Sequence, residues 1–335
     1  MSTPLTQKLS SLDAFLLRTG SGMLSGRGRN ASLLVMIFHR VLPQPDPMMP
    51  DEPDAASFAA QMDLVAENFN VLPLREAITR LRDGSLPPRA LCITFDDGYA
   101  NNYEVALPIL AARKLPATVF VAAGFLNGGR MFNDTVIETV RGAGVVIDLE
   151  AEGIGKFDLT KPGARRAAQR EIVTKLKYLS PPDRMREAEA LAARLGVKLP
   201  SNLMMTDDQV RKLAAAGVEI GAHTMTHPIL TRIDADTARR EITESKRRLE
   251  EILGMPVRSF AYPNGRPGQD YDGTHVKIAK EAGFDLAVST AWGAATSGSD
   301  NFQIPRVAPW DASARRYGMR LMKAYRQRQF QTATC

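Results

Sequence analysis

The stretch Leu91-Cys92-Ile93-Thr94-Phe95-Asp96-Asp97-Gly98 decides how this chain is expected to fold. Its first five residues are apolar or β-branched and a turn residue closes the run, which is typical of a buried strand. Asp96 and Asp97 therefore come where that strand ends. Adjacent carboxylates in such a place are unfavourable unless a cation or a proton is shared between them. The same residues also occur in exposed turns and as helix N-caps, so this stretch alone leaves a purely structural role open.

A second predicted strand end carries two histidines. Gly217–Ala222 is another strand-like run, and His223-Thr-Met-Thr-His227 follows it directly. Two imidazoles at this spacing can converge on one metal ion, and a carboxylate can complete a site with three protein ligands. The whole chain contains only 4 histidines, so a pair at this spacing is informative.

The two motifs, in this order and each at a strand end, resemble the first two motifs of the polysaccharide deacetylases (carbohydrate esterase family four, the NodB-homology domain). Phe260-Ala261-Tyr262-Pro263-Asn264-Gly265 resembles the third motif of that family, with Ala261 in the place of its usual arginine. The resemblance covers residues 33–310 and is interrupted by residues 131–205. It implies a distorted (β/α)7 barrel.

The pattern of the whole chain also predicts an α/β fold with parallel strands. Seven strand-like runs are separated mostly by helical segments, and they lie at 33–38, 91–95, 117–122, 218–222, 257–261, 286–290 and 302–307. Such alternation is typical of βα units with the helices outside. In barrels of this type the loops after the strands share one face and build the site. His39 follows the first run, so we expect it beside Asp96 and His223.

We divide the chain into three parts. Residues 1–32 are expected to form a helix over 4–18 and a glycine- and serine-rich linker, residues 33–310 the deacetylase barrel, and residues 311–335 a basic, helical tail. Residues 131–205 contain strongly charged helices and a hairpin near 145–149, without dense apolar patterning. We interpret them as an insertion packed against the barrel, with a lid as one role.

Charged and apolar patterns on two helices leave alternatives open. The helix over 4–18 places Leu5, Leu9, Leu12, Leu16 and Leu17 at helical spacing. Docking on the protein body is the favoured interpretation because few basic groups accompany these residues, and a helix lying on a membrane is the alternative. In the helix over 234–253, Glu241 with Ser245 shows the spacing of an exposed surface.

Composition limits the class of protein. With 44% hydrophobic and 24% charged residues, the chain is that of an ordinary globular protein with a substantial core. Cys92 and Cys335 form no disulfide framework, and the N-terminus shows no signal-peptide pattern, so we expect a cytoplasmic protein. The formal net charge of +6 fits an anionic membrane or a phosphorylated sugar carrier, but equally a solvated surface. Basic and aromatic residues are not interleaved, so we expect no nucleic-acid partner.

The resemblance assigns roles to individual residues. It implies that Asp97, His223 and His227 hold one divalent metal ion and that Asp96 is the general base. The backbone N–H of Asn264 would donate a hydrogen bond to the oxyanion. Because the ligand set is rich in nitrogen, we expect Zn²⁺, with Ni²⁺, Co²⁺ and Mn²⁺ as alternatives.

Two departures from the family pattern move roles to other residues. The third motif lacks its arginine, so Arg306 is our candidate to hold Asp96 and lower its pKa. The usual late catalytic histidine is also missing, because no histidine follows His275, which we place in a polar surface loop. Phe38-His39 matches relatives that resemble poly-N-acetylglucosamine deacetylases and carry this histidine near the N-terminus. His39 thus becomes the general-acid candidate.

Four further residues are candidates for contact with a sugar: Tyr262, Pro263, Trp292 and Trp310. For the two tryptophans, packing in the core or at the rim is the more common role.

The leading hypothesis is a metal-dependent hydrolase that removes N-acetyl groups from N-acetylhexosamine units of a cell-surface polysaccharide or its cytoplasmic precursor. A lipid-linked or nucleotide-linked sugar would suit a cytoplasmic enzyme, and peripheral membrane contact is compatible with it. Deformylation or other amide hydrolysis on a non-polymeric substrate is a second enzyme hypothesis. A catalytically inactive sugar-binding module is a third, although it would need neither Asp96 nor His39 beside its metal.

Overall fold

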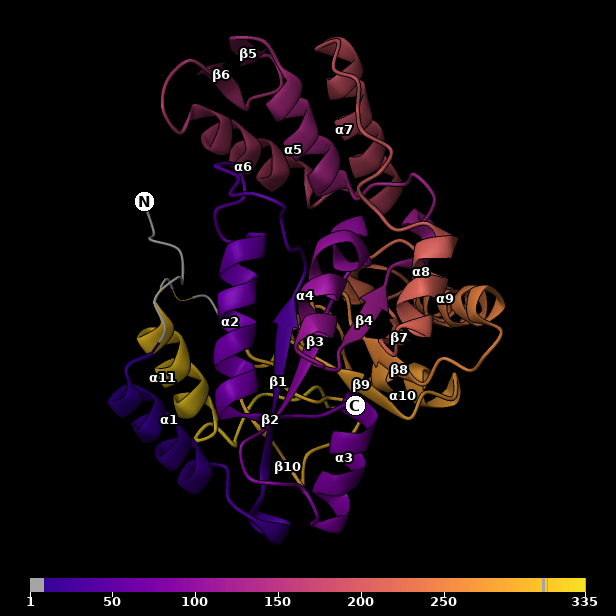
Figure 1. The fold of residues 1–335 in the computed structure, drawn as a ribbon. Helices are drawn as coiled ribbons and strands as arrows, with labels where there is room; N and C mark the ends of the chain where they lie inside the picture. The colour runs from indigo at the N-terminus through magenta and orange to yellow at the C-terminus, as the bar shows by residue number, and fades with distance from the viewer. Residues whose placement is uncertain (1–8, 309–310, 312, 335) are drawn as a thin grey trace.

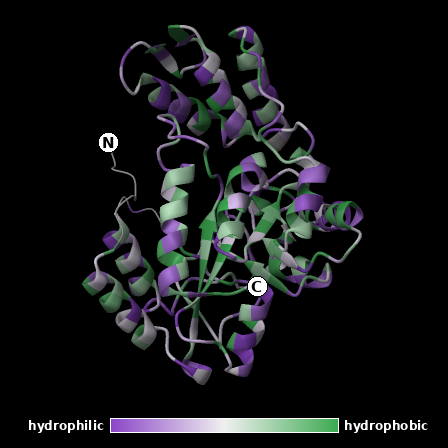
Figure 2. Ribbon diagram, viewed as in Figure 1, coloured by the Kyte–Doolittle hydropathy of each residue, from purple (hydrophilic) through white to green (hydrophobic). Residues whose placement is uncertain are grey.

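A curled sheet of mostly parallel strands forms the centre of the molecule, with helices around it and a further group of helices over one end (Figure 1). The computed structural model describes residues 9–308, 311 and 313–334. Trp310 and residues 4–8 of the predicted first helix lie outside these ranges. Hydrophobic strands are enclosed by helices with hydrophilic outer faces (Figure 2).

Six parallel strands form where the apolar runs predict them. In spatial order they are β1 (Ser32–Phe38), β3 (Ala90–Phe95), β4 (Thr118–Val121), β7 (Glu219–Ala222), β8 (Ser259–Ala261) and β9 (Leu286–Val288). β1 and β3 are buried along their whole length, which explains why their sequences are continuously apolar instead of alternating. Two short strands are added to them: β2 (Asn70–Val71) pairs with β3, and β10 (Ala295–Thr296) pairs antiparallel with β1.

The prediction of a regular seventh strand over 302–307 is wrong. This segment makes only isolated parallel bridges, at Ile304 to β9 and at Val307 to β1. Pro305 between them has no N–H to donate, so a continuous ladder cannot form. The segment still closes the ring, because the Val307 N–H donates to β1 at 2.8 Å. The fold is therefore the predicted distorted (β/α)7 barrel, with an irregular seventh member.

Helices on the outside of the sheet follow the predicted pattern. They are α2 (Ala55–Asn68), α3 (Leu74–Asp83), α4 (Leu107–Ala112), α8 (Asp207–Ala215), α9 (Ala235–Leu253) and α10 (Gly273–Glu281). A π-helical segment, Asn102–Ala106, precedes α4. α8 begins with a capping box in which Thr206 and Gln209 exchange hydrogen bonds, and α9 ends at Gly254 in the left-handed conformation.

Helix α1 (Ser11–Leu24) extends into the segment that we predicted to be a linker. It lies beside α11 (Ala314–Ala324), and the side chain of Leu17 packs at Gly318 (Figure 1). This packing outweighs the low helix propensity of the glycines in α1. The helix is docked on the body, as the favoured interpretation had it. Among the described residues, no helix is long and apolar enough to cross a membrane.

The insertion stands over the end of the barrel (Figure 1). It contains α5 (Phe132–Gly142), the hairpin of β5 (Val146–Leu149) with β6 (Gly155–Asp158), α6 (Ala164–Leu176) and α7 (Pro181–Arg194). Contrary to our expectation, these elements bury an apolar cluster of their own, which includes Val136, Val140, Ile147, Ile172 and Leu191.

Candidate metal and catalytic site

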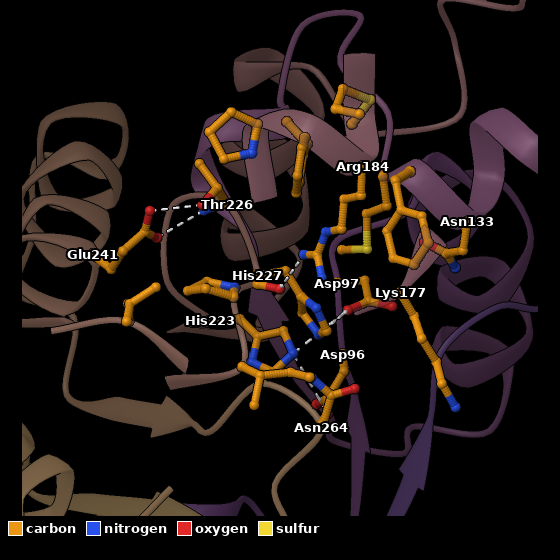
Figure 3. A pocket seen from close by; sticks show the side chains of 18 of the residues that line it. Asp96, Asp97, Asn133, Lys177, Arg184, His223, Thr226, His227, Glu241 and Asn264 are labelled. Atoms are coloured by element: carbon orange, nitrogen blue, oxygen red, sulfur yellow. Dashed lines mark hydrogen bonds and ion pairs between the residues drawn. The ribbon is translucent and has the colours of Figure 1, made fainter. Parts of the chain in front are cut away.

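A pocket of about 780 Å³ lies between the strand ends and the insertion (Figure 3). Its lining brings together the predicted motif residues and the end of the first strand: His39, Asp96, Asp97, His223, His227 and Asn264. These residues follow β1, β3, β7 and β8. Their convergence follows from the parallel arrangement, because the carboxyl ends of parallel strands share one face.

Asp97, His223 and His227 form a cluster suited to a metal ion. The Nε2 atoms of both histidines lie 3.5 Å from Asp97 Oδ1, and one potential ligand atom from each residue lies within 4.8 Å of the others. Asp97 Oδ1 is buried and has no hydrogen-bond partner among the described residues. A buried, unsatisfied carboxylate oxygen that faces two imidazoles is what a divalent cation would satisfy. The residues present therefore fit a metal ion.

The backbone at these positions is held in an uncommon conformation. Asp97, Thr224, His227 and Asn264 have φ angles of 78°, 63°, 50° and 59°. A positive φ in a residue other than glycine costs on the order of 1 kcal/mol and is found preferentially at functional sites. The Thr224 side chain helps to maintain the turn, since its Oγ1 accepts a hydrogen bond from the His227 N–H at 3.1 Å.

The orientation of His223 is fixed from its other side. Its Nδ1 lies 2.7 Å from the carbonyl oxygen of Ala261, and a carbonyl can only accept, so Nδ1 carries the proton. Nε2 is then left with its lone pair toward Asp97, as a metal-ligating imidazole requires.

Asp96 has a different partner from Asp97. Arg306 is buried and binds Asp96 through two hydrogen bonds, Nη1 to Oδ1 at 2.6 Å and Nη2 to Oδ2 at 2.7 Å. Burial by itself raises the pKa of Asp96, but the charge of Arg306 and its hydrogen bonds outweigh burial, so the pKa is lowered. The pKa of Asp97 is lowered too, because His223 and His227 outweigh the effect of its burial. Both groups are therefore carboxylates at neutral pH.

Arg306 lies in the irregular segment that closes the barrel. It holds Asp96, as we expected from the sequence. Its Nε donates to the carbonyl oxygen of Ser289 at 2.9 Å, which aligns the guanidinium with the carboxylate. Ala261, at the position of the missing family arginine, is fully buried at the end of β8.

His39 and Asn264 border the same pocket. The carbonyl oxygen of His39 accepts a hydrogen bond from the Asn102 side chain at 2.9 Å, which fixes the backbone after β1. A charge on His39 is close enough to lower the pKa of both Asp96 and Asp97. Asn264 is held by Thr290, whose Oγ1 donates to its carbonyl oxygen at 2.7 Å. In the part of the chain that the structure describes, the Asn264 N–H has no acceptor.

Three of the predicted sugar contacts are not part of the pocket lining, and for the buried Tyr262 and Pro263 the prediction is corrected. Tyr262 and Pro263 are buried, and the Tyr262 ring stacks on Tyr271 with 3.9 Å between centroids. Trp292 is exposed, but it is not part of the lining. The side chains of Tyr262 and Pro263 thus turn into the core, whereas Asn264 after them reaches the pocket. Trp310 lies outside the described residues.

The assignments of one histidine and one glutamate also change. His275 is buried instead of lying on the surface, because it belongs to the capping box that begins α10. Glu241 is not a plain surface residue: its Oε2 accepts hydrogen bonds from the backbone N–H groups of Met225 and Thr226, both at 2.8 Å. Glu241 therefore holds the loop that carries the two histidines (Figure 3). Its i,i+4 spacing concealed this role, and no signal in the single sequence indicated it.

Comparisons with known proteins identify the family of this chain. A family model described as polysaccharide deacetylase matches residues 83–153 and 183–287, just over half of the chain. A putative polysaccharide deacetylase of Bacillus subtilis, YxkH, is 20% identical over 279 residues, which are 83% of this chain and 71% of that protein. The poly-β-1,6-N-acetyl-D-glucosamine N-deacetylase of Staphylococcus aureus is 24% identical over 166 residues. That match covers 47% of this chain and 56% of the staphylococcal protein.

Solved structures share the fold. The Streptococcus pyogenes deacetylase PplD in complex with acetate superposes with a TM-score of 0.59 at 19% identity, covering 88% of this chain and 98% of that one. IcaB from Ammonifex degensii gives a TM-score of 0.57 at 21% identity, covering 90% and 98%. The chain belongs to the polysaccharide deacetylase family, which comprises hydrolases acting on amide bonds.

Proposed function

We propose that this protein is a metal-dependent hydrolase that removes the N-acetyl group from an N-acetylhexosamine unit of a cell-surface glycan or its precursor. The observation that carries the proposal is the different environment of two adjacent carboxylates. Asp97 faces His223 and His227, whereas Asp96 is held by Arg306. A site that only binds a metal ion would need the histidines that face Asp97, but it would not need the arginine that keeps Asp96 ionised.

Each residue of the pocket has a separate task in amide hydrolysis. Asp96 is ionised at neutral pH and would accept the proton of the attacking water. The free N–H of Asn264 would donate to the oxygen that becomes negative in the tetrahedral intermediate. His39 would give a proton to the departing amine, since imidazole can exchange protons near neutrality.

Asp97, His223 and His227 would hold the metal ion. When bound, a divalent ion would supply Lewis acidity toward the amide carbonyl and the water. We propose Zn²⁺, because two imidazoles and one carboxylate are a common Zn²⁺ ligand set, with Ni²⁺, Co²⁺ and Mn²⁺ as alternatives.

A lipid-linked or nucleotide-linked precursor is the substrate form that we propose, together with a cytoplasmic site of action. The buried Cys92 thiol is free, which is compatible with a reducing compartment. Cell fractionation with an antibody to the chain tests the location: recovery of the protein outside the inner membrane would contradict it.

We also propose that the outer face of α1 and α11 touches an anionic membrane. More than half of the surface of each of four apolar side chains of α1 is exposed: Leu12, Phe15, Leu16 and Met23. The neighbouring helix α11 presents exposed basic residues, among them Arg315, Arg316, Arg320 and Lys323. Because α1 itself has few basic groups, the sequence favoured docking on the protein body over membrane contact. In the fold, α11 from the other end of the chain places basic groups beside α1. An apolar stripe beside cationic groups is the pattern of a helix at an anionic lipid surface.

The proposed activity is tested by measuring acetate release from N-acetylglucosamine oligomers and from lipid-linked N-acetylglucosamine. Formate release from the N-formyl analogues is measured in parallel. Activity should disappear when the metal is removed with a chelator and return with Zn²⁺. Undiminished hydrolysis by protein shown to be metal-free would contradict the proposal.

A further inference from the structure

A buried arginine of the insertion points into the pocket and has no ionic partner in the part of the chain that the structure describes. Arg184 of α7 is 8% exposed. Its guanidinium lies 4.6 Å from the centre of the Phe132 ring, and Nη2 donates to the carbonyl oxygen of His227 at 3.2 Å. Burial lowers the pKa of Arg184, and no carboxylate among the described residues offsets this effect. Figure 3 shows the side chain reaching from the insertion toward His227.

An unpaired buried cation is unfavourable by several kcal/mol. We therefore expect the substrate to bring an anionic group that pairs with Arg184. Among the described residues, the hydrogen bond to His227 uses a single nitrogen of a group that has five N–H donors. Guanidinium groups bind phosphate through two parallel hydrogen bonds. A neutral N-acetylglucosamine polymer offers no anion to this residue.

The pocket has an apolar wall. It consists of side chains from the insertion and from the loop after His227, namely Phe132, Val173, Met185, Pro228, Ile229 and Ile233, while Asn133, Thr226, Thr237 and Glu241 also line the pocket. Sugar hydroxyls and nucleotide bases need hydrogen-bond partners when they are buried, and the side chains of the apolar wall provide none. A hydrocarbon chain would be stabilised by the same surface.

The segment after helix α6 adds one basic side chain to this pocket. Lys177, directly after α6, lines the pocket together with Val173. Arg166 and Arg170 lie on the same face of the helix and line an adjoining cavity of about 430 Å³, where carboxylates are also present and Arg166 pairs with Asp51 at 3.5 Å. The family model passes from residue 153 to residue 183 and thus omits α6. This part of the wall is therefore an addition to the family pattern.

We propose, building on the deacetylation proposed above, that the substrate is an N-acetylated amino sugar that carries a phosphate and an apolar chain. Arg184, with Lys177, binds the phosphate, and the apolar wall of the insertion accommodates the chain. The substrate class is thus a lipid-phosphate-linked sugar instead of a neutral polymer or a nucleotide sugar.

A binding experiment tests the recognition independently of catalysis. Farnesyl phosphate, farnesol and uridine monophosphate are titrated into the metal-loaded protein by calorimetry. Farnesyl phosphate should bind most tightly. Arg184→Gln keeps an N–H donor for His227 but removes the charge, and it should weaken farnesyl phosphate binding by about tenfold or more. Arg186→Gln on the same helix is the control, because Arg186 is exposed and paired with Asp183.

Equal binding of farnesyl phosphate and farnesol, or unchanged binding by Arg184→Gln, would overturn the phosphate assignment. Tighter binding of uridine monophosphate than of farnesyl phosphate would overturn the assignment of the apolar wall. Metal content is measured for both variants. If Arg184→Gln loses metal together with ligand binding, Arg184 only supports the His227 loop and the proposal is wrong.

Turnover separates this inference from the proposed function. Farnesyl-phosphate-linked N-acetylglucosamine should be deacetylated with a higher kcat/KM than the neutral tetramer or the uridine diphosphate sugar. Arg184→Gln should raise KM for the phosphate-linked sugar by a clearly larger factor than KM for the neutral tetramer. Absence of acetate release from every substrate, with farnesyl phosphate binding as expected, would refute the deacetylase function and not the recognition. A neutral tetramer that is the best substrate, with Arg184→Gln indifferent, would refute the recognition alone.

Discussion

Arg306 and Asp96 form a two-point ion pair across the seam where the irregular segment closes the barrel onto β1, with N–O distances of 2.6 and 2.7 Å. The pair is fully enclosed, since the two side chains are 0% and 4% exposed. It keeps one of two adjacent carboxylates charged and holds it beside the metal cluster, with Asp96 Oδ2 3.9 Å from His223 Nε2. The structure thereby separates the proposed proton acceptor from the proposed metal ligand.

Arg306→Gln should therefore change the ionisation of Asp96 as well as stability. Without the guanidinium, burial dominates and the pKa of Asp96 rises, so the acid limb of the pH–rate profile should move to higher pH. Leaving a buried carboxylate unpaired should cost about 3–5 kcal/mol of unfolding free energy. Rates and melting temperatures measured across pH test both effects, and an unmoved acid limb would contradict the assignment.

The same pair predicts how stability depends on pH. The pKa of Asp96 is below its ordinary value of 3.8 in the folded protein. Its contribution to stability is thus fully present above about pH 4 and is lost as the pH falls through the folded pKa. Arg306→Gln should abolish or reverse this loss of stability at acid pH, which urea unfolding at pH 2–7 would show.

His39→Gln should retain metal and fold but lose turnover. As the general acid, His39 must be protonated when the amine departs, so its removal should shift or flatten the alkaline limb of the pH–rate profile. The expected loss in kcat is on the order of a hundredfold. His275→Gln is the matched control, because His275 is a buried helix cap away from the pocket. It should lower the melting temperature without lowering kcat. Unimpaired kcat in well-folded His39→Gln protein would eliminate the general-acid role.

Glu241→Ala should weaken metal binding although Glu241 is not a ligand. The substitution removes the acceptor for two backbone N–H groups in the loop between His223 and His227. Groups that orient metal ligands typically contribute about 10–100-fold to affinity. Zn²⁺ affinity is measured by competition with a chelator. Glu244→Ala, an exposed position on the same helix, is the control, and equal affinities in the two variants would refute the positioning role.

The double variant Leu12→Ser/Phe15→Ser should reduce binding to anionic vesicles without reducing turnover of a water-soluble substrate. Its loss of apolar contact should lower the bound fraction in co-sedimentation with phosphatidylglycerol vesicles. Met255→Ser is the control, since Met255 is exposed after α9 and is not part of the α1–α11 face. No difference between the two variants, or equal binding to neutral vesicles, would contradict the membrane proposal.

The elements and pocket residues that local patterns specify could be predicted from the sequence. Continuous apolar runs mark the buried strands, and parallel strands bring their ends to one face. Asp97, His223 and His227 therefore meet as expected. Arg306 could be anticipated because the third motif lacks its arginine, yet its segment is irregular since Pro305 interrupts the ladder.

What the sequence could not show are contacts set by packing between distant segments. Glu241 lies on a charged helix whose pattern is that of a solvated surface, and only the fold places it under the histidine loop. Arg184 lies in an insertion helix whose charged pattern hides its burial. Tyr262 was expected in the pocket because of its motif, but the chain turns it into the core against Tyr271.

The division of roles between Asp96 and Asp97 is the central claim, and one paired measurement tests it most directly. Metal content and acetate release are determined on the same preparations of wild type, Asp96→Asn and Asp97→Asn. Asp96→Asn should keep its metal and lose about a hundredfold or more in kcat, as expected when a general base is removed. Asp97→Asn should lose its metal first. Equal loss of metal in both variants, or full activity of Asp96→Asn with metal bound, would contradict the account.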